Sequence, residues 1–567
     1  MKGNNKGMTQ PQSLWHQGIK PGVIGGISAL AIALVGMVES FNKRYIVADV
    51  ITMGIALIIV VAVLIAYYAA KRTVGGNRAV FINAVTAALV TSGCLAMLVI
   101  LGHMVNIRAV LINASPALYK ILTAGFEGAG GIFILLLGGL ICGLIAGVLY
   151  VIPELIRRVT IICVSSVMIA GLLQDLIRPV LASWEVLSLI SDWLYTQNGL
   201  TISGTIAIVV IIGICHVIWA KKGEGLKEGY TKLPGGTQRN IKIASFIILA
   251  IFLIVLPHLL GLFLSEVLTI VGLFILLGLG LNIVVGYAGL LDLGYVAFFA
   301  IGAYTTAILT SPELGFFSLT FWQALPFAII LGILSGVLLG IPVLKMRGDY
   351  LAIATLGFGE IIRILVLSDF LKPWLGGAQG VGTIPNPVIA GYKIVEPQQI
   401  YYLILAGCML VVFMSIRLRD SRLGRAWMAM REDEDVAQAM GINLVATKLL
   451  AFATGAGFSA LSGAIFVTKI GSVYPHSFNV MISINVICLI IVGGIGSIPG
   501  VIVGAAALVG LPELLREFAE YRFLVYGAAL VAMMILRPEG LWPEARHKLE
   551  LHKEENDVEE AETARAT

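Results

Sequence analysis

Residues 417–448 read RLRDSRLGRAWMAMREDEDVAQAMGINLVATK and form a charged island between long apolar runs. Within this island the acidic residues 433–435 precede the short segment 436–440, and Gly441 follows that segment. Acidic residues near the first turn and a glycine just past the last turn are typical of a short helix, because they suit the helix dipole and a left-handed C-terminal turn. The sequence therefore predicts a short helix that projects between two hydrophobic segments.

The rest of the chain has the composition of a membrane protein. Hydrophobic residues make up 58% of its 567 residues, charged residues make up 13%, and the mean hydropathy is +0.96. Apolar runs of about twenty residues recur from end to end, and each is long enough to cross about 30 Å of hydrocarbon as a helix. We therefore predict an all-α polytopic membrane protein with about 16 transmembrane helices.

The apolar runs fall into two groups on either side of residues 221–240, a charged and glycine-rich stretch that is typical of a boundary between modules. Near the end of the second group we expect one span over 482–501 and the next over 502–515. In the first group we expect a continuous span over 159–181. The predicted domains are an N-terminal membrane module with a linker over 1–241, a core over 242–542 and a charged cytoplasmic tail over 543–567.

Basic residues indicate which loops face the cytoplasm. The net charge is +5, and the basic residues lie mainly in short loops between apolar runs. In a membrane protein this arrangement indicates topology rather than a surface that binds nucleic acid. Lys71–Arg72, Arg157–Arg158 and the stretch 221–242 fall at alternate connections, and the positive-inside rule assigns these loops, the N-terminus and the charged island to the cytoplasm. Lys43–Arg44 is the exception.

Three polar residues in apolar surroundings have two interpretations each. Asn282 and Asn485 precede glycine clusters, where a helix can break or pack closely, and each could bind a solute or another helix. Helix-to-helix bonding is the favoured interpretation for both. Asp292 could meet the ammonium group of a small zwitterionic solute, but we favour its use as the N-cap of the next span.

The sequence predicts one further ion pair and no metal or nucleotide site. Glu360 and Arg363 lie three residues apart and are predicted to form a structural ion pair on one helix face. The histidines and the six cysteines show no metal-ligand spacing, so no metal site is predicted. The sequence contains no phosphate-binding loop of the GxxxxGK[ST] type, so no nucleotide cofactor is expected on this chain. The triplet 461–463, Leu-Ser-Gly, is interpreted as small residues for helix packing.

Four longer motifs carry a resemblance to a known family. They read LGLNIVVGYAGLLDLGYVAFFAIGAY at 279–304, RGDYLAIATLGFGEIIR at 347–363, GRAWMAMREDED at 424–435 and RPEGLW at 537–542. Together they resemble the LivM-type permease of branched-chain amino-acid ABC importers, and the resemblance covers about 243–542. It implies a permease core with an N-terminal helical extension, in the inner membrane of a bacterium.

The resemblance also implies partners. These are a second related permease subunit, two cytoplasmic ATP-binding subunits that carry the ATP, and an extracytoplasmic solute-binding protein. The charged island then resembles the loop that docks importers onto their ATPases, although it departs from the Glu-Ala-Ala pattern at Asp435 and Val436. We expect Val436 and Met440 to enter a groove in the ATPase while the acids pair with cations at its rim.

Two sets of site residues follow from these interpretations. The expected ATPase-coupling residues are Arg431, Glu432, Asp433, Glu434, Asp435, Val436, Ala437, Met440 and Gly441. The expected residues of the translocation path are Asn282, Asp292, Tyr304 and Asn485.

Alternative functions stay open at this point. The resemblance implies leucine, isoleucine and valine as solutes, whereas related systems carry urea, short amides or other amino acids. An ion-coupled secondary transporter would use Asp292, Asn282 and the glycine-rich breaks, but it leaves the charged island unexplained. A membrane-embedded enzyme is disfavoured because no cluster of nucleophile, base or metal-ligand residues is present in the sequence.

Overall fold

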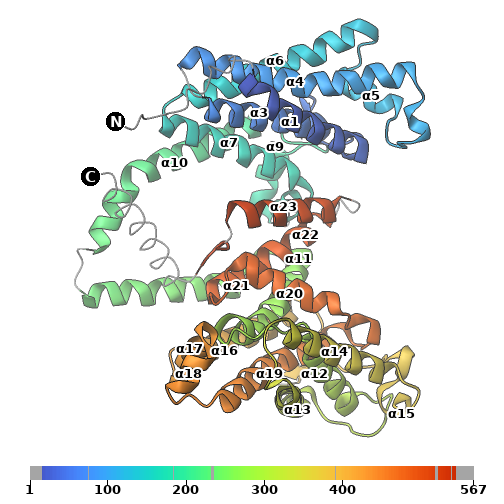
Figure 1. The fold of residues 1–567 in the computed structure, drawn as a ribbon, viewed down its shortest axis with the longest axis vertical. Coiled ribbons are helices and arrows are strands. Elements are labelled where there is room, and N and C mark those ends of the chain that lie inside the picture. The colour runs from blue at the N-terminus through green and yellow to red at the C-terminus, as the bar shows by residue number, and fades with distance from the viewer. Residues whose placement is uncertain are drawn as a thin grey trace, which may run out of the picture. The chain divides into compact units, whose positions relative to one another are not determined.

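The computed structural model describes residues 16–73, 76–182, 184–231, 235–389, 391–516, 521–537 and 539–543. Within these ranges the chain is mostly helical, with two short β-hairpins, and it divides into two compact units, residues 1–245 and 246–567 (Figure 1). Twelve helices of the described part are long and apolar enough to cross a membrane, and two shorter helices are also apolar. The prediction of an all-α polytopic membrane protein is confirmed. The predicted tail lies outside the described residues beyond Pro543.

The first unit is built from helices and one hairpin. Its elements are α1 His16–Val35, α2 Met37–Phe41, β1 Tyr45–Val47, β2 Ile51–Thr52, α3 Met53–Arg72, α4 Asn77–Met104, a 3-10 turn Ile107–Ala109, α5 Pro116–Leu122, α6 Gly128–Val151, α7 Glu154–Leu172, α8 Gln174–Ala182, α9 Glu185–Leu194 and α10 Ile202–Thr231. Helix α10 extends into the stretch that the sequence predicts as a linker.

Small residues hold the helices of this unit close together. A Cβ atom on Gly22 of α1 would lie 2.8 Å from the carbonyl oxygen of Ala87 in α4. A Cβ atom on Gly143 of α6 would lie 2.6 Å from the Cα atom of Val85, also in α4. Because lipid is as apolar as the side chains, such close backbone approach is a main source of helix association in membranes. Helix α4 is therefore the centre on which α1 and α6 pack.

One sequence expectation changes in the first unit. The predicted span over 159–181 is wrong as a single helix, because α7 ends at Leu172 and α8 begins at Gln174. Asp175 of α8 forms an ion pair with Arg44, with 2.6 Å between Oδ2 and Nη1. This ion pair partly neutralises the one basic pair that departs from the positive-inside pattern.

The second unit begins within α11 and contains most of the remaining elements. They are α11 Gly235–Leu281, a π-helix Asn282–Tyr287, α12 Val296–Thr310, α13 Phe321–Val343, α14 Asp349–Leu367, α15 Lys372–Leu375, β3 Val388–Ile389, β4 Tyr392–Lys393, α16 Pro397–Arg419, α17 Arg422–Glu432, α18 Glu434–Ala439, α19 Leu444–Ile470, α20 Val480–Gly493, α21 Ile498–Ala505, a π-helix Ala506–Gly510, α22 Leu511–Leu514 and α23 Arg522–Leu536. Helix α11 is interrupted at Gly261, which has φ 75° and ψ −173°.

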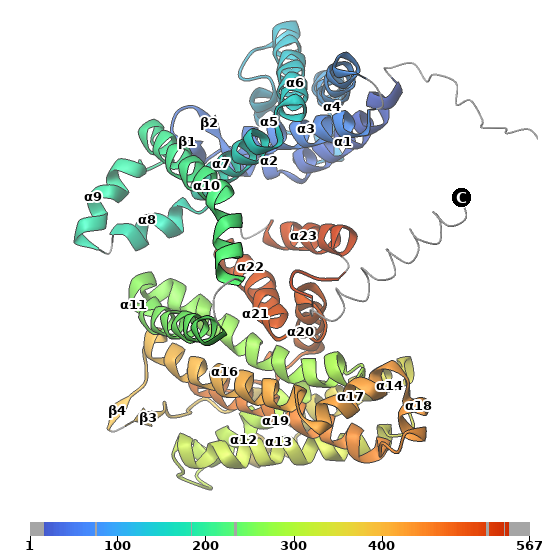
Figure 2. The same cartoon turned by 90° about the vertical axis from the view of Figure 1, so that its left-hand side faces the viewer.

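Helix α19 lies at the centre of the second unit, against α12, α13 and α16 (Figures 1 and 2). It is the most buried of the twelve candidate spans. A Cβ atom on Gly463 would lie 2.1 Å from the carbonyl oxygen of Phe299 in α12, so only glycine fits there. The Ser462 hydroxyl donates to the carbonyl of Leu273 at 3.1 Å. The interpretation of residues 461–463 as a helix-packing motif is confirmed.

The two glycine-rich regions are breaks in their helices, and they meet. After α11 the chain passes through the π-helix Asn282–Tyr287 and an irregular segment before α12 begins. The predicted span over 482–501 is wrong, because α20 ends at Gly493 and α21 begins at Ile498. Between them Gly494 and Gly496 have φ values of 121° and 82°, which favour glycine. The Asn282 Oδ1 atom accepts a hydrogen bond from the Gly496 amide at 2.9 Å and joins the breaks.

Candidate functional site

The charged island folds as two short helices fixed to the start of α19. Helix α17 begins after Ser421, whose hydroxyl accepts a hydrogen bond from the Gly424 amide at 3.2 Å. The indole of Trp427 is fully buried, and its Nε1 atom donates to the carbonyl of Thr447 at 2.8 Å. A buried aromatic side chain with a satisfied polar atom fixes a helix firmly. Helix α17 therefore holds the following helix, α18, at a defined position.

Helix α18 has a well-formed cap at each end. Asp433 is its N-cap, and the Oδ1 atom accepts hydrogen bonds from the amides of Asp435 and Val436 at 2.8 and 2.9 Å. At the other end Gly441 has a φ of 87°, the left-handed conformation that ends many helices. The predicted short helix with acids at its N-terminal end is confirmed, and Glu434 is its first helical residue.

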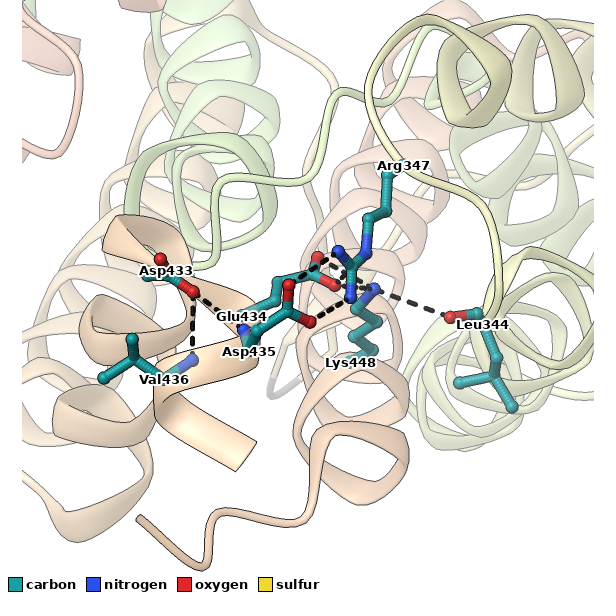
Figure 3. A network of polar contacts seen from close by, with 7 residues as sticks. All are labelled: Leu344, Arg347, Asp433, Glu434, Asp435, Val436 and Lys448. Atoms are coloured by element: carbon teal, nitrogen blue, oxygen red, sulfur yellow. Dashed lines mark hydrogen bonds and ion pairs between the residues drawn. The ribbon is translucent and has the colours of Figure 1, made fainter. Parts of the chain in front are cut away.

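A network of ion pairs holds the inner side of α18 (Figure 3). The Arg347 guanidinium, in the segment between α13 and α14, contacts Glu434 Oε2 at 2.9 Å and Asp435 Oδ1 at 2.8 Å. Lys448 of α19 contacts Glu434 Oε1 at 2.9 Å and donates to the carbonyl of Leu344 at 3.5 Å. The side chain of Lys448 is only 4% exposed and that of Glu434 is 18% exposed. Glu434 thus lies between two cations from different parts of the core.

Asp435 differs from Glu434 because its side chain is 75% exposed. Its hydrogen bond from Arg347, together with the charge of that guanidinium, lowers the pKa of Asp435 below its ordinary value, and the same contact raises the pKa of Arg347. Such a carboxylate stabilises the folded protein at any pH above its ordinary pKa of about 4. This stabilisation is lost only as the pH falls from there through the lowered pKa. At neutral pH this ion pair is therefore fully charged.

The outer side of α18 exposes two large apolar side chains. Val436 is 57% exposed and Met440 is 80% exposed, whereas Ala437 between them is buried at 3%. Residues four apart lie on one face of a helix, so Val436 and Met440 form a single apolar knob. An amphipathic helix with such a face is the shape that enters a hydrophobic groove in a partner.

Arg431 connects the charged island to the first helix break. Its Nη1 atom, from the last turn of α17, donates to the carbonyl of Gly286 in the π-helix at 2.6 Å. Gly289 follows with a φ of 70°, and a Cβ atom there would lie 2.9 Å from Arg431 Cγ. The island thus contacts the break that Asn282 joins to Gly496. The sequence predicts that Arg431 belongs to the docking surface. In the structure its guanidinium instead donates to the backbone of the core.

The predicted path residues do not form one cluster. Asn282 is buried, and its hydrogen bond to Gly496 is the helix-to-helix interaction favoured from the sequence. Asn485 is exposed on α20. Asp292 is fully buried and its Oδ1 atom accepts from the Gly294 amide at 2.9 Å. The N-cap prediction for Asp292 is wrong, because Tyr295 precedes α12 and Asp292 instead stabilises the turn before it.

Three further predicted residues lie on α12 and α14. The Glu360 and Arg363 side chains contact each other at 2.8 Å, as expected for residues three apart on a helix. They are 34% and 36% exposed. Tyr304 is buried on α12 at 4% exposure. Tyr304 and Arg363 both line one small hollow.

Comparison with known proteins assigns the family. A family model described as the permease component of branched-chain amino acid transport systems matches residues 263–536. The high-affinity branched-chain amino acid transport system permease protein LivM of Salmonella typhimurium is 41% identical over 52% of this chain and 74% of that protein. The chain belongs to the branched-chain amino acid transport permease family. The resemblance seen in the sequence is confirmed.

Two other relatives extend this result. LivM of Escherichia coli is 41% identical to this permease over 50% of the chain and 71% of that protein. LivH of Salmonella typhimurium, another permease protein of such a system, is 24% identical over 47% of this chain and 90% of that protein. No solved structure matches the permease. The matched region 263–536 contains both helix breaks and the charged island.

Sequence reasoning missed three residues of this site. Arg347 lies in one of the family motifs, but nothing nearby shows that it meets Asp435, which is 88 residues away. Lys448 stands at the start of an apolar run, where a basic residue is usually a boundary marker. Gly496 contributes only a backbone amide. The one sequence signal that could have identified Lys448 is its position 14 residues after the acidic Glu434.

Replacing Gly441 by valine tests the C-terminal cap of α18. A β-branched residue at a φ of 87° is strained by about 1–2 kcal/mol, although a Cβ atom would meet nothing within 4 Å. We expect normal membrane insertion and roughly a three- to tenfold loss of branched-chain amino-acid uptake, measured in cells that express the transporter. Gly441→Asn should retain most transport, because asparagine tolerates the left-handed conformation. Normal transport by the valine variant would exclude a role for this cap.

Proposed function

We propose that this permease passes leucine, isoleucine and valine from an extracytoplasmic binding protein through the bacterial inner membrane to the cytoplasm, with ATP hydrolysed on separate subunits. The family and the printed names of the relatives support the solute class. The main support for an ATP-driven mechanism is the apolar knob of Val436 and Met440. It lies on a helix that ion pairs hold to the core. A secondary transporter would leave this surface unexplained.

The proposed partners follow from the same features. Helix α18 would enter a groove in one of two cytoplasmic ATP-binding subunits, with the exposed carboxylate of Glu432 at the rim. A second permease subunit, related to this one as LivH is, would complete the path. We propose residues 242–542 as the transport core and residues 1–241 as a peripheral helical module that stabilises the core or shields it from lipid.

Movement of the docked helix would reach the path through defined contacts. A displacement of α17 and α18 pulls on the Gly286 carbonyl through Arg431, and on the segment before α14 through Arg347. Arg431 binds the π-helix that follows α11, and the same π-helix accepts a hydrogen bond from Gly496 in the break between α20 and α21. The two discontinuous helices can therefore move together. Broken helices of this kind form the solute and ion sites of other transporters, around which the two halves rock during alternating access.

Reconstitution tests the proposed function. The permease, its cognate second permease and the two ATP-binding subunits are placed in proteoliposomes with the binding protein outside, and labelled leucine, isoleucine, valine and urea are compared. We expect leucine, isoleucine and valine uptake that requires ATP inside and survives an ionophore. Uptake driven by an ion gradient without ATP would overturn the proposal, and uptake of urea alone would replace the solute class.

Replacing Val436 and Met440 together by serine tests docking. Removing these apolar groups should weaken association with the ATP-binding subunits by about 1–2 kcal/mol, or roughly tenfold in Kd, because less apolar surface is buried. Association is measured by titrating ATP-binding subunits onto the permease in nanodiscs. A matched control is Val445→Ser, which removes a 51% exposed apolar side chain from α19. Equal loss of affinity in both variants would contradict docking at α18.

A further inference from the structure

An apolar groove runs along one face of α4 in the first unit. Its volume is about 390 Å³ and it is open along one side. That volume lies within the range of roughly 300–1,000 Å³ that is typical of ligand pockets. The residues that line it come from α4 alone, and they are Phe81, Ile82, Val85, Thr86, Leu89 and Val90.

The groove offers only apolar surface to a ligand. Thr86 is the one polar residue of its lining, and the Thr86 hydroxyl donates to the carbonyl of Ile82 at 2.5 Å within the helix. A polar solute would lose its hydrogen bonds to water in such a groove and gain none, which is costly. The groove therefore suits a hydrocarbon chain.

The neighbouring helices flank this groove without filling it. A Cβ atom on Gly22 of α1 would lie 2.7 Å from Val90 Cβ, and one on Gly147 of α6 would lie 2.6 Å from Phe81 Cδ1. Helices α1 and α6 thus approach α4 closely at the two edges of the groove. Helix α3 packs on the opposite side of α4, against Ala84 and Ala88. The groove opens on the side of α4 that α1, α3 and α6 leave uncovered.

The depth of the groove matches one leaflet of a bilayer. The positive-inside rule assigns the start of α4 to the cytoplasmic side. Measured from Asn77, where α4 begins, Phe81 and Val90 lie about 6 and 20 Å along the helix at 1.5 Å per residue. One leaflet contributes about half of the roughly 30 Å hydrocarbon core. The groove therefore lies mainly in the cytoplasmic leaflet and can follow one acyl chain along its length.

Arg78 lies at the cytoplasmic end of the groove. It precedes Phe81 and Ile82 by three and four residues, so it lies on the same face of α4 as the groove. Its side chain is exposed. A guanidinium can bind a phosphate group with two parallel hydrogen bonds. Arg78 is therefore placed to bind the phosphate of a lipid whose chain lies in the groove.

Two further cations lie close to Arg78. Lys71 and Arg72 end α3, and both are exposed. The Arg72 Cζ atom lies 4.6 Å from the centroid of the Tyr68 ring, and this contact restrains the guanidinium. Residues 53–126, from the start of α3 to the loop before α6, contain no Asp or Glu. The cytoplasmic end of the groove is therefore positively charged, which favours an anionic headgroup over a zwitterionic one.

We propose that this groove binds an acyl chain of an anionic phospholipid from the cytoplasmic leaflet, with Arg78, Arg72 and Lys71 binding its phosphate. The inference does not depend on the solute or on the source of energy for transport. It gives the N-terminal module a ligand of its own.

Native mass spectrometry of the purified permease, titrated in mild detergent with phosphatidylglycerol or phosphatidylethanolamine, tests the charged end. We expect Arg72→Gln with Arg78→Gln to weaken phosphatidylglycerol binding about ten- to thirtyfold and to remove its preference over phosphatidylethanolamine. The control Arg108→Gln with Lys120→Gln removes two exposed cations beyond the other end of α4 and should leave binding unchanged. Unchanged binding in the first variant, or an equal loss in the control, overturns the proposal.

A second variant tests the groove itself. Leu89→Trp places a large side chain in the groove, and we expect it to weaken binding of both phospholipids about threefold or more. Leu64→Trp, at a 62% exposed position of α3, is the matched control and should bind as the wild type does. Unchanged phospholipid binding in Leu89→Trp overturns the proposal. If that variant instead loses association with the second permease subunit, a helix of that subunit occupies the groove.

Discussion

Glu434→Ala is expected to have the largest effect of any single change in the charged island. It leaves the ammonium of Lys448, only 4% exposed, without its carboxylate, and removing one partner of a buried ion pair costs about 3–5 kcal/mol. Arg347 would retain Asp435, which is largely exposed. We therefore expect α18 to lose its fixed position on the core. Hydrogen exchange of the amides in residues 434–441 should increase, and transport per ATP should fall strongly.

Two further variants determine whether the buried charge is the cause. Asp435→Ala removes the more exposed carboxylate of the same network and should have a much smaller effect, because exposed ion pairs contribute little. The double variant Glu434→Ala with Lys448→Met removes both charges and should recover much of the lost protection. Equal exchange rates in Glu434→Ala and Asp435→Ala would contradict this account, as would a double variant that is no better than the single one.

The sequence predicts the parts of this permease that depend on local patterns. The composition and the length of the apolar runs identify a membrane protein, and α18 follows from the acids before it and from Gly441 after it. The exposed knob also follows, because Val436 and Met440 are four residues apart. These features need only helix geometry and a few neighbouring residues.

The features that the sequence does not predict depend on distant contacts. Asn282 and Gly496 are 214 residues apart. The Asn282 side chain accepts from the backbone amide of Gly496, and no side chain at that position indicates the contact in the sequence. The break after Gly493 lies inside a continuous apolar run, so hydropathy alone merges it with its neighbours. Asp292 precedes a span as an N-cap does, but the chain makes one more turn before α12. In these three cases the structure depends on which parts of the chain pack together, and the residue types alone do not indicate it.

Arg431→Met is expected to separate ATP hydrolysis from transport. The change keeps an apolar stem of similar length but removes the donor that binds the Gly286 carbonyl at 2.6 Å. Hydrogen bonds from charged groups contribute about 1.5–3 kcal/mol, so transport per ATP should fall roughly ten- to a hundredfold. The knob of Val436 and Met440 is untouched, and affinity for the ATP-binding subunits should therefore stay normal.

A matched substitution on the same helix makes this test specific. Arg425 also lies on α17, but its Nη1 atom donates to the carbonyl of Asp420 within the island and not to the core. If α17 transmits movement through Arg431, Arg425→Met should keep transport close to normal while Arg431→Met loses it. If both variants lose transport equally, the basic charge of the island matters and the contact with Gly286 does not. Because Gly286 adjoins the break that binds Gly496, only the first result would make Arg431 the link from the docked helix to both discontinuous spans.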